Sequence, residues 1–189
     1  MTSIPIIVQA RLSSKRLPKK VLKEIKKLAV IDWIHTRLSN VNFKNEIVIA
    51  TSSAKSDDEL FQYCLKKDYK VIRGSLNNVA KRFHQVLQPI DCKYIFRVCA
   101  DSPFIDPKLL NAAYELSFED ADIITNVHKR TYPKGQSVEL INKKSFMNIY
   151  PYLNKASERE HITSRFYKDY KNYKIINFES THDFSQIRV

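Results

Sequence analysis

The order of the short apolar runs limits the fold of this chain more than any other feature. Five runs are rich in β-branched and aromatic side chains, as are strands that are buried on both faces of a sheet. They are residues 6–8, 47–50, 71–72, 94–96 and 123–124. Helical patterns separate these runs, so strand and helix alternate along the chain. We therefore predict an α/β fold with a mostly parallel sheet between two helical layers, in one domain of residues 1–189.

Helix signals between the runs support this alternation. Residues 28–41 carry apolar side chains at three- and four-residue steps, which predicts an amphipathic helix. Ser56 and Glu59 form a capping-box pattern for a second helix. Asn78 is expected to cap a third, and Asp106, which precedes a proline, a fourth.

The pattern changes after the fifth run. Residues 127–150 begin with a polar stretch that contains proline and glycine, which predicts a hairpin-like insertion. Ser157 with Glu160 is expected to cap a late helix, and residues 173–178 are expected to form a last strand.

The composition of the chain limits the kinds of ligand and site that it can have. The net charge of +12 favours anionic partners such as phosphates, acidic metabolites or nucleic acid. Only two glycines occur, which excludes the glycine-rich phosphate-binding motifs. The three cysteines have no paired spacing that would indicate a disulfide framework or a zinc site. No stretch has the apolar length of a membrane span, so we expect a cytoplasmic protein without a membrane partner.

A basic segment follows the first predicted strand. Residues 11–20 contain five cations, and in a parallel sheet this position is where ligands bind. Arginine can contact two phosphate oxygens at once, and lysine supplies a mobile charge. On charge alone, the segment could equally be a solvated basic loop. The position of the segment, directly after a strand, favours a polyanion site.

The same segment resembles a known family. Residues 9–22 are similar to the A-R-x-x-S-x-R-L-P-x-K signature of the cytidylyltransferases that make CMP-activated acidic sugars, and most similar to the branch named for spore coat polysaccharide biosynthesis protein F. The resemblance implies a Rossmann-like fold of the nucleotide-diphospho-sugar transferase type, whose loop holds the triphosphate of CTP. The matching positions are Ala10, Arg11, Ser14, Arg16 and Lys20. Ser13 replaces the usual glycine.

A second match implies a metal site. Residues 97–107 resemble the family segment R-x-x-G-D-x-P-x-x-D-P, with Ala100 in place of its glycine. The resemblance implies that Asp101 holds Mg²⁺ against the nucleotide phosphates, since Mg²⁺ typically takes one or two carboxylates plus phosphate oxygens. A turn residue without a ligand is the alternative for Asp101.

Weaker matches cover residues 73–83, 132–139 and 158–163, where Asn78 and Ser137 replace family aspartates. By resemblance, the first lies near the nucleoside and the other two near the sugar. The candidates are Arg73 and Arg82 for the nucleotide, and Lys134, Glu139, Arg159 and His161 for the acceptor. Structural roles are the alternative for the residues around His161.

The resemblance implies transfer of CMP from CTP to an acidic sugar with release of pyrophosphate, in surface polysaccharide or glycan biosynthesis. It assigns catalysis to Arg16, Lys20 and Asp101, and it implies a homodimer with residues 127–150 at the interface. Family members usually continue beyond the position of Val189 into a T-V-D-x-x-x-D segment whose first aspartate completes the metal site, and we expect this chain to lack it.

Three alternatives follow. The chain could be a nucleotide-binding module without catalysis, which the expected loss of that segment suggests. It could be a transferase of another nucleotide, because the fold and the phosphate loop do not read the base. A nucleic-acid-binding protein is the third, suggested by the charge and by ten Tyr and ten Phe; we do not expect it, because most of these aromatics fall at core positions.

Overall fold

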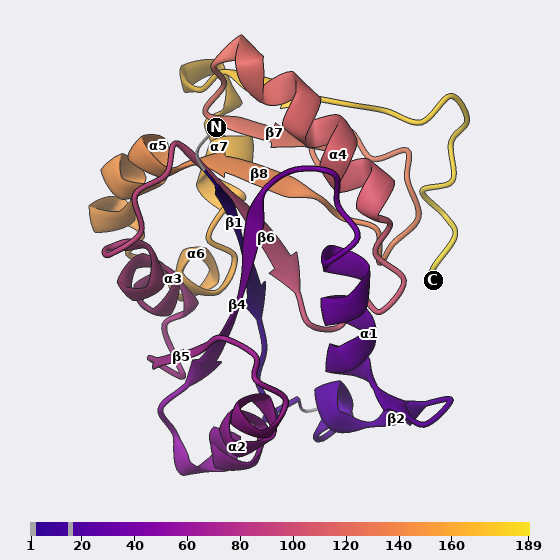
Figure 1. Ribbon diagram of the computed structural model, residues 1–189. Coiled ribbons are helices and arrows are strands. Elements are labelled where there is room, and N and C mark those ends of the chain that lie inside the picture. The colour runs from indigo at the N-terminus through magenta and orange to yellow at the C-terminus, as the bar shows by residue number, and fades with distance from the viewer. Residues whose placement is uncertain (1–2, 15–16) are drawn as a thin grey trace.

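The computed structural model describes residues 3–14 and 17–189, and its centre is one mixed sheet (Figure 1). Within these residues, seven strands pair in the order β5-β4-β1-β6-β8-β7-β9. They are β1 (Ile4–Gln9), β4 (Asn45–Ser52), β5 (Val71–Gly74), β6 (Tyr94–Cys99), β7 (Ile123–Thr125), β8 (Glu139–Asn142) and β9 (Ile175–Asn177). β8 runs antiparallel to β6 and β7, and every other pairing in the sheet is parallel. The predicted α/β fold is therefore confirmed.

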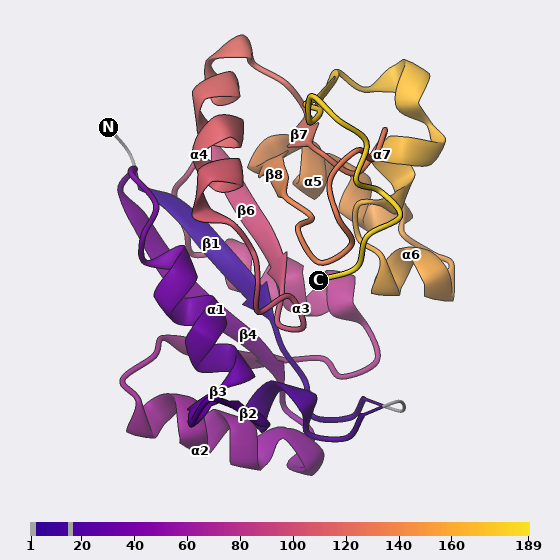
Figure 2. The same cartoon turned by 90° about the vertical axis from the view of Figure 1, so that its right-hand side faces the viewer.

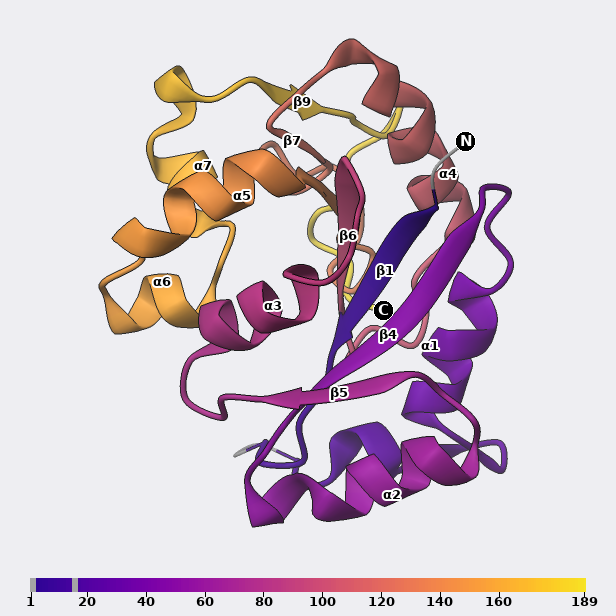
Figure 3. The ribbon, with the colours of Figure 1, turned by 60° about the vertical axis from the view of Figure 1, so that its left-hand side comes forward.

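Helices cover both faces of the sheet (Figure 3). One layer contains α1 (Val30–Leu38), α2 (Asp58–Lys66) and α4 (Pro107–Leu116). The other contains α3 (Val79–Leu87), α5 (Lys143–Ile149), α6 (Ala156–Glu160) and α7 (Ser164–Lys168). Alternate residues of β1 serve the two layers, because Ile6 and Val8 join the core under α1 while Ile7 joins the core under α3.

Smaller elements complete the chain. Strands β2 (Glu24–Ile25) and β3 (Leu28–Ala29) form a separate hairpin before α1 (Figure 2). Short 3₁₀ helices are η1 (Lys20–Leu22), η2 (Lys55–Asp57), η3 (Ser117–Glu119), η4 (Tyr150–Tyr152) and η5 (Tyr170–Asn172). In the described part of the chain, no helix has the length and apolar character needed to cross a membrane.

Two of the predicted helix caps are confirmed and two are wrong. The Asn78 side chain accepts a hydrogen bond from the Lys81 amide, and Asp106 accepts one from the Lys108 amide. Ser56 lies inside η2 and does not cap α2, which begins at Asp58. Similarly, α6 begins at Ala156, ahead of Ser157, and the Glu158 side chain accepts from the amide of Lys155. The Glu158 carboxylate thus stabilises the start of α6, whereas α2 begins without a side-chain cap hydrogen bond.

Residues 127–150 divide into three parts. A loop follows β7, and β8 then returns antiparallel to β7, which is the geometry of a wide hairpin. Residues 143–149 form α5, whose Phe146 and Ile149 are buried, so this part belongs to the helical layer. The C-terminal segment runs along the loop: the Lys134 amide donates to Ile187 O, and the Val189 amide donates to Lys134 O.

Candidate active site

The basic loop after β1 is fixed at its start by a buried acid. The Leu12 amide donates to Asp57 Oδ1 at 2.7 Å, and the Ser52 hydroxyl donates to the other oxygen of the same carboxylate. The Ala10 amide continues the β1–β4 ladder by donating to Ala50 O. Asp57 has no exposed surface. The loop therefore leaves the carboxyl end of β1 from a defined position, and Asp57 is a site residue that the sequence interpretation missed.

The cations of this loop contact carboxylates from three other elements. Arg11 pairs with Glu160 of α6 at 3.2 Å, Lys20 with Asp101 at 3.4 Å, and Lys19 with Glu59 of α2. Their side chains are between 34% and 61% exposed, and such pairs contribute at most about 1 kcal/mol each. An incoming polyanion can therefore displace them.

The remaining loop candidates have simpler surroundings. The Ser14 hydroxyl accepts a weak hydrogen bond from the Leu17 amide at 3.4 Å, which leaves its own proton available to a ligand. Arg16 lies outside the described residues.

Arg82 adds a further cation to the same edge, from inside the protein. It is 2% exposed, its Nη1 donates to Ser75 O at 2.7 Å, and its Nε has no hydrogen-bond partner among the described residues. Burial lowers the pKa of Arg82, and the charge of Arg11 lowers it further. Gly74 permits this packing, because a Cβ there would lie 2.9 Å from the Arg82 side chain. Arg82 thus lies against Gly74 and Ser75, at the carboxyl end of β5.

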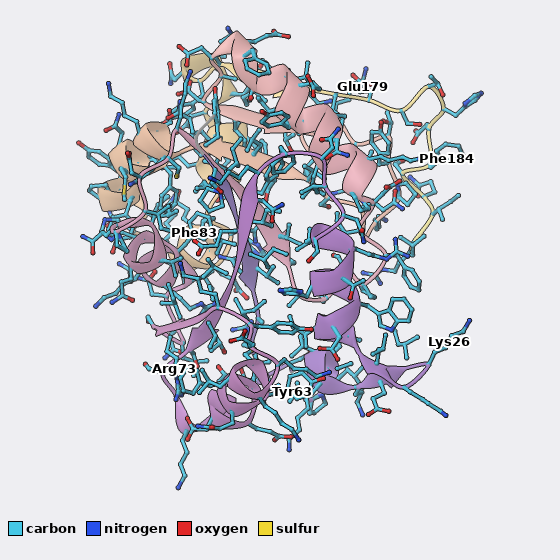
Figure 4. All side chains as sticks on the ribbon, viewed as in Figure 1. Lys26, Tyr63, Arg73, Phe83, Glu179 and Phe184 are labelled. Carbon is cyan, nitrogen blue, oxygen red and sulfur yellow. The ribbon has the colours of Figure 1, made fainter. Side chains whose placement is uncertain are left out.

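The side chain of Arg73, labelled in Figure 4, forms its contacts with other residues of the protein. Its guanidinium donates to Ser52 O and Ala54 O, forms an ion pair with Asp58 at 2.6 Å, and lies over the Phe61 ring. These contacts hold the connection between β4 and α2 against β5. The structure therefore gives this nucleotide candidate a role in the fold.

Asp101 stands alone as a metal candidate. It follows β6 at the same edge as the basic loop, and its side chain is half exposed. The described residues contain no group of three or more His, Cys, Asp or Glu side chains that could hold a metal ion. One carboxylate fits Mg²⁺ only when phosphate oxygens and water supply the other ligands, which is the usual arrangement for nucleotide-bound Mg²⁺.

A buried ion pair joins β6 and β8 behind this edge. Arg97 and Glu139 are register partners on the two strands, and the Arg97 Nη1 donates to Glu139 Oε2. Tyr167 of α7 donates to Glu139 Oε1 at 2.6 Å. Burial favours the neutral carboxyl, but the Arg97 charge and the hydrogen bonds outweigh it and hold the pKa of Glu139 below its usual value. The resemblance predicts that Glu139 touches the sugar; in the structure its carboxylate is buried and contacts Arg97 and Tyr167.

The other acceptor candidates lie apart. Lys134 is exposed on the loop after β7, beside the C-terminal segment. Arg159 and His161 are exposed at the end of α6, near the Arg11–Glu160 pair in sequence, and the Arg159 Nε donates to Leu153 O. Ala10, Arg11, Lys20, Arg82 and Asp101 lie at the carboxyl edge of the sheet, whereas Lys134 contacts the C-terminal segment.

Comparison with known proteins agrees with this geometry. A cytidylyltransferase family model matches residues 5–189. Spore coat polysaccharide biosynthesis protein SpsF of Bacillus subtilis is 33% identical over 153 residues, which cover 79% of this chain and 63% of that protein. A 3-deoxy-manno-octulosonate cytidylyltransferase of Koribacter versatilis is 22% identical over 76% of this chain and 56% of its own length. The chain thus spans less than two thirds of either relative.

Solved structures share the whole architecture. A cytidylyltransferase from Leptospira borgpetersenii superimposes with a TM-score of 0.93 at 25% identity, covering 100% of this chain and 80% of that one. A CMP:2-keto-3-deoxy-manno-octonic acid synthetase in complex with CTP superimposes with a TM-score of 0.72 at 16% identity, covering 95% and 90% of the two chains, and shows the fold alone. With the family match over residues 5–189, the chain belongs to the cytidylyltransferase family.

Proposed function

We propose that this chain transfers CMP from CTP to an acidic sugar and releases pyrophosphate. The observation that carries the proposal is that Arg11, Lys20, Arg82 and Asp101 all lie at the carboxyl ends of strands in one sheet, where α/β folds bind ligands. Three cations can neutralise most of the charge of a triphosphate, and the carboxylate can hold the metal that accompanies it. The names of the relatives support the choice of nucleotide and acceptor.

In this reaction a hydroxyl of the sugar attacks the α-phosphorus, and the bond from this phosphorus to the bridging oxygen of pyrophosphate breaks. Most of the catalysis comes from positioning and charge neutralisation. Arg11 and Lys20 would bind the outer phosphates after leaving Glu160 and Asp101, and Arg16 would join them from the same loop. The Ser14 hydroxyl would donate to a phosphate oxygen. Mg²⁺, when bound at Asp101, would supply further charge stabilisation.

The acceptor would lie toward the β8 side of the edge. Arg159, His161 and Lys134 are the exposed cationic or titratable groups in the segments that resemble the family's sugar-binding regions, and they suit a carboxylate on the sugar. Arg73 and Glu139 would act on substrates only through the strands that they fix.

The test combines binding with turnover. Melting midpoints with Mg²⁺ and CTP, UTP, GTP or ATP should rise most with CTP, because a ligand of the folded state stabilises it according to its affinity. Pyrophosphate release with acidic sugars should fall at least about tenfold in Lys20→Met and in Asp101→Asn. Lys44→Met is the matched control, since this exposed lysine lies ahead of β4 at the opposite edge. Equal activity in all four proteins would refute the assignment.

The expected homodimer is part of the same proposal. Residues 127–150 combine the loop after β7 with β8 and α5, and the resemblance assigns this stretch to the subunit contact. Sedimentation velocity on the purified chain should give twice the mass of 22.2 kDa. A single species at the monomer mass would refute it.

A further inference from the structure

The last residue of β1 holds a hydrogen-bond donor that the fold leaves unused. Arg97 Nε donates to Gln9 Oε1 at 2.9 Å, while Gln9 Nε2 is buried without a partner among the residues that the structure describes. The orientation of this amide follows from chemistry, because a guanidinium can only donate and must therefore face the amide oxygen. Buried donors are rarely left unpaired, since losing water without gaining a partner costs free energy.

Arg97 is itself held in place, so the amide has a fixed direction. Glu139 binds the far side of the Arg97 guanidinium, and Tyr167 and Thr163 hydrogen-bond to the Glu139 carboxylate. The chain of contacts runs from α7 through β8 and β6 to β1. Ordering these buried polar groups costs free energy, and the network holds the Gln9 amide in one orientation. The amide is therefore preorganised to donate to a ligand oxygen.

The position of the amide connects it with the loop. The Ala10 amide continues the ladder beyond β1, so the side chains of Gln9 and Arg11 leave the same face of the sheet. Arg11 forms an exposed ion pair with Glu160 of α6, and a phosphate can displace this carboxylate. A ligand that binds Arg11 would therefore lie two residues along the chain from Gln9, on the same side of the sheet.

We propose that Gln9 is a substrate-contacting residue: once a bound polyanion draws Arg11 away from Glu160, the Gln9 Nε2 donates a hydrogen bond to a substrate oxygen at the reaction centre. This oxygen belongs either to the phosphate being transferred or to the acceptor sugar. Both kinds of oxygen accept a hydrogen bond from an amide donor. This inference rests on the proposed function, since the amide has a partner only in a substrate complex.

Gln9→Glu separates this role from a structural one. The glutamate keeps an oxygen for Arg97 Nε but replaces the donor with a second oxygen, which repels a substrate oxygen. A structural role predicts wild-type turnover in a folded variant. The proposal predicts that kcat/KM falls about ten- to a hundredfold in a variant that still folds. Gln9→Met removes the donor without adding charge and should show a loss in the same range if the glutamate variant fails to fold.

The measurements also locate the oxygen. A lost CTP-dependent rise in melting midpoint assigns it to the nucleotide, whereas an intact rise with a higher KM for the acidic sugar assigns it to the acceptor. Gln62→Glu, an exposed position on α2, controls for added charge. Turnover within twofold of wild type in both Gln9 variants would overturn the inference. A wild-type chain that neither binds CTP nor releases pyrophosphate would instead remove the proposed function, and this inference with it.

Discussion

Removing one partner of the buried Arg97–Glu139 pair should cost more stability than any surface change in this chain. The two side chains are 14% and 5% exposed, so Arg97→Met leaves a carboxylate away from water with only hydroxyl donors. Breaking a buried pair in this way costs about 3–5 kcal/mol in the free energy of unfolding. For a domain of this size that loss corresponds to a fall of about 6–20 °C in melting midpoint.

A double-mutant cycle tests the reasoning. Glu139→Leu alone should also destabilise strongly, because it leaves the guanidinium unpaired, but the combination with Arg97→Met should cost much less than the sum. Urea denaturation with a constant slope is the assay, since a changed midpoint at constant slope reports stability. A loss below about 1 kcal/mol in Arg97→Met, or additive single effects, would refute the view that the pair is desolvated.

The pH dependence of the stability of Arg97→Met gives an independent test of the buried pair. In the wild type the pKa of Glu139 lies below its usual value, so its stabilising contribution is present at neutral pH and is lost as pH falls through the folded-state pKa. Arg97→Met removes the cation that lowers this pKa, and burial then raises it. The stability gap between wild type and variant should therefore narrow as pH falls from 7 toward 4. A constant gap would contradict this assignment.

Two further predictions concern sites away from the reaction centre. Asp32 is buried and accepts from Tyr63 and Tyr69, which help to keep its pKa low against burial; Asp32→Ala should cost about 2–4 kcal/mol in urea denaturation at pH 7, and less on acidification below the usual pKa of aspartate. Gly135 has φ of +109°, and a Cβ there would lie 2.8 Å from Val189 O; Gly135→Ala should cost about 1–3 kcal/mol and speed hydrogen exchange at the Val189 amide, whereas unchanged exchange would show that this contact does not hold the segment.

Local signals explain which parts of the fold were predictable. Strands buried on both faces leave apolar runs, so β1, β4, β5, β6 and β7 could be read from single segments. Asn78 and Asp106 cap their own helices, and each bond spans at most three residues. The start of α2 was not predictable in this way, because the Asp57 carboxylate binds Ser52 and Leu12, and the Leu12 contact crosses 45 residues.

The site was predictable only in part for the same reason. The resemblance assigned Arg11, Lys20 and Asp101 to one site, and the structure brings their segments to one edge of the sheet. It did not reveal that Arg97 faces Glu139, because that contact depends on the register of β6 and β8. A charged residue inside an otherwise apolar strand was the available signal, since such a residue needs a buried partner.

The cations at or behind the carboxyl edge differ in how firmly the fold holds them. Arg82 and Arg97 are buried by the fold and keep their positions, whereas Arg11 and Lys20 are held by exposed carboxylates. In the ligand-free chain those carboxylates neutralise Arg11 and Lys20, whereas Arg82 donates to the carbonyl oxygen of Ser75. In the proposed site, a triphosphate that binds Lys20 would also release Asp101, so phosphate binding and the availability of the metal ligand would be coupled. We expect Mg²⁺ to bind weakly alone and more tightly with the nucleotide, because each removes a competitor of the other.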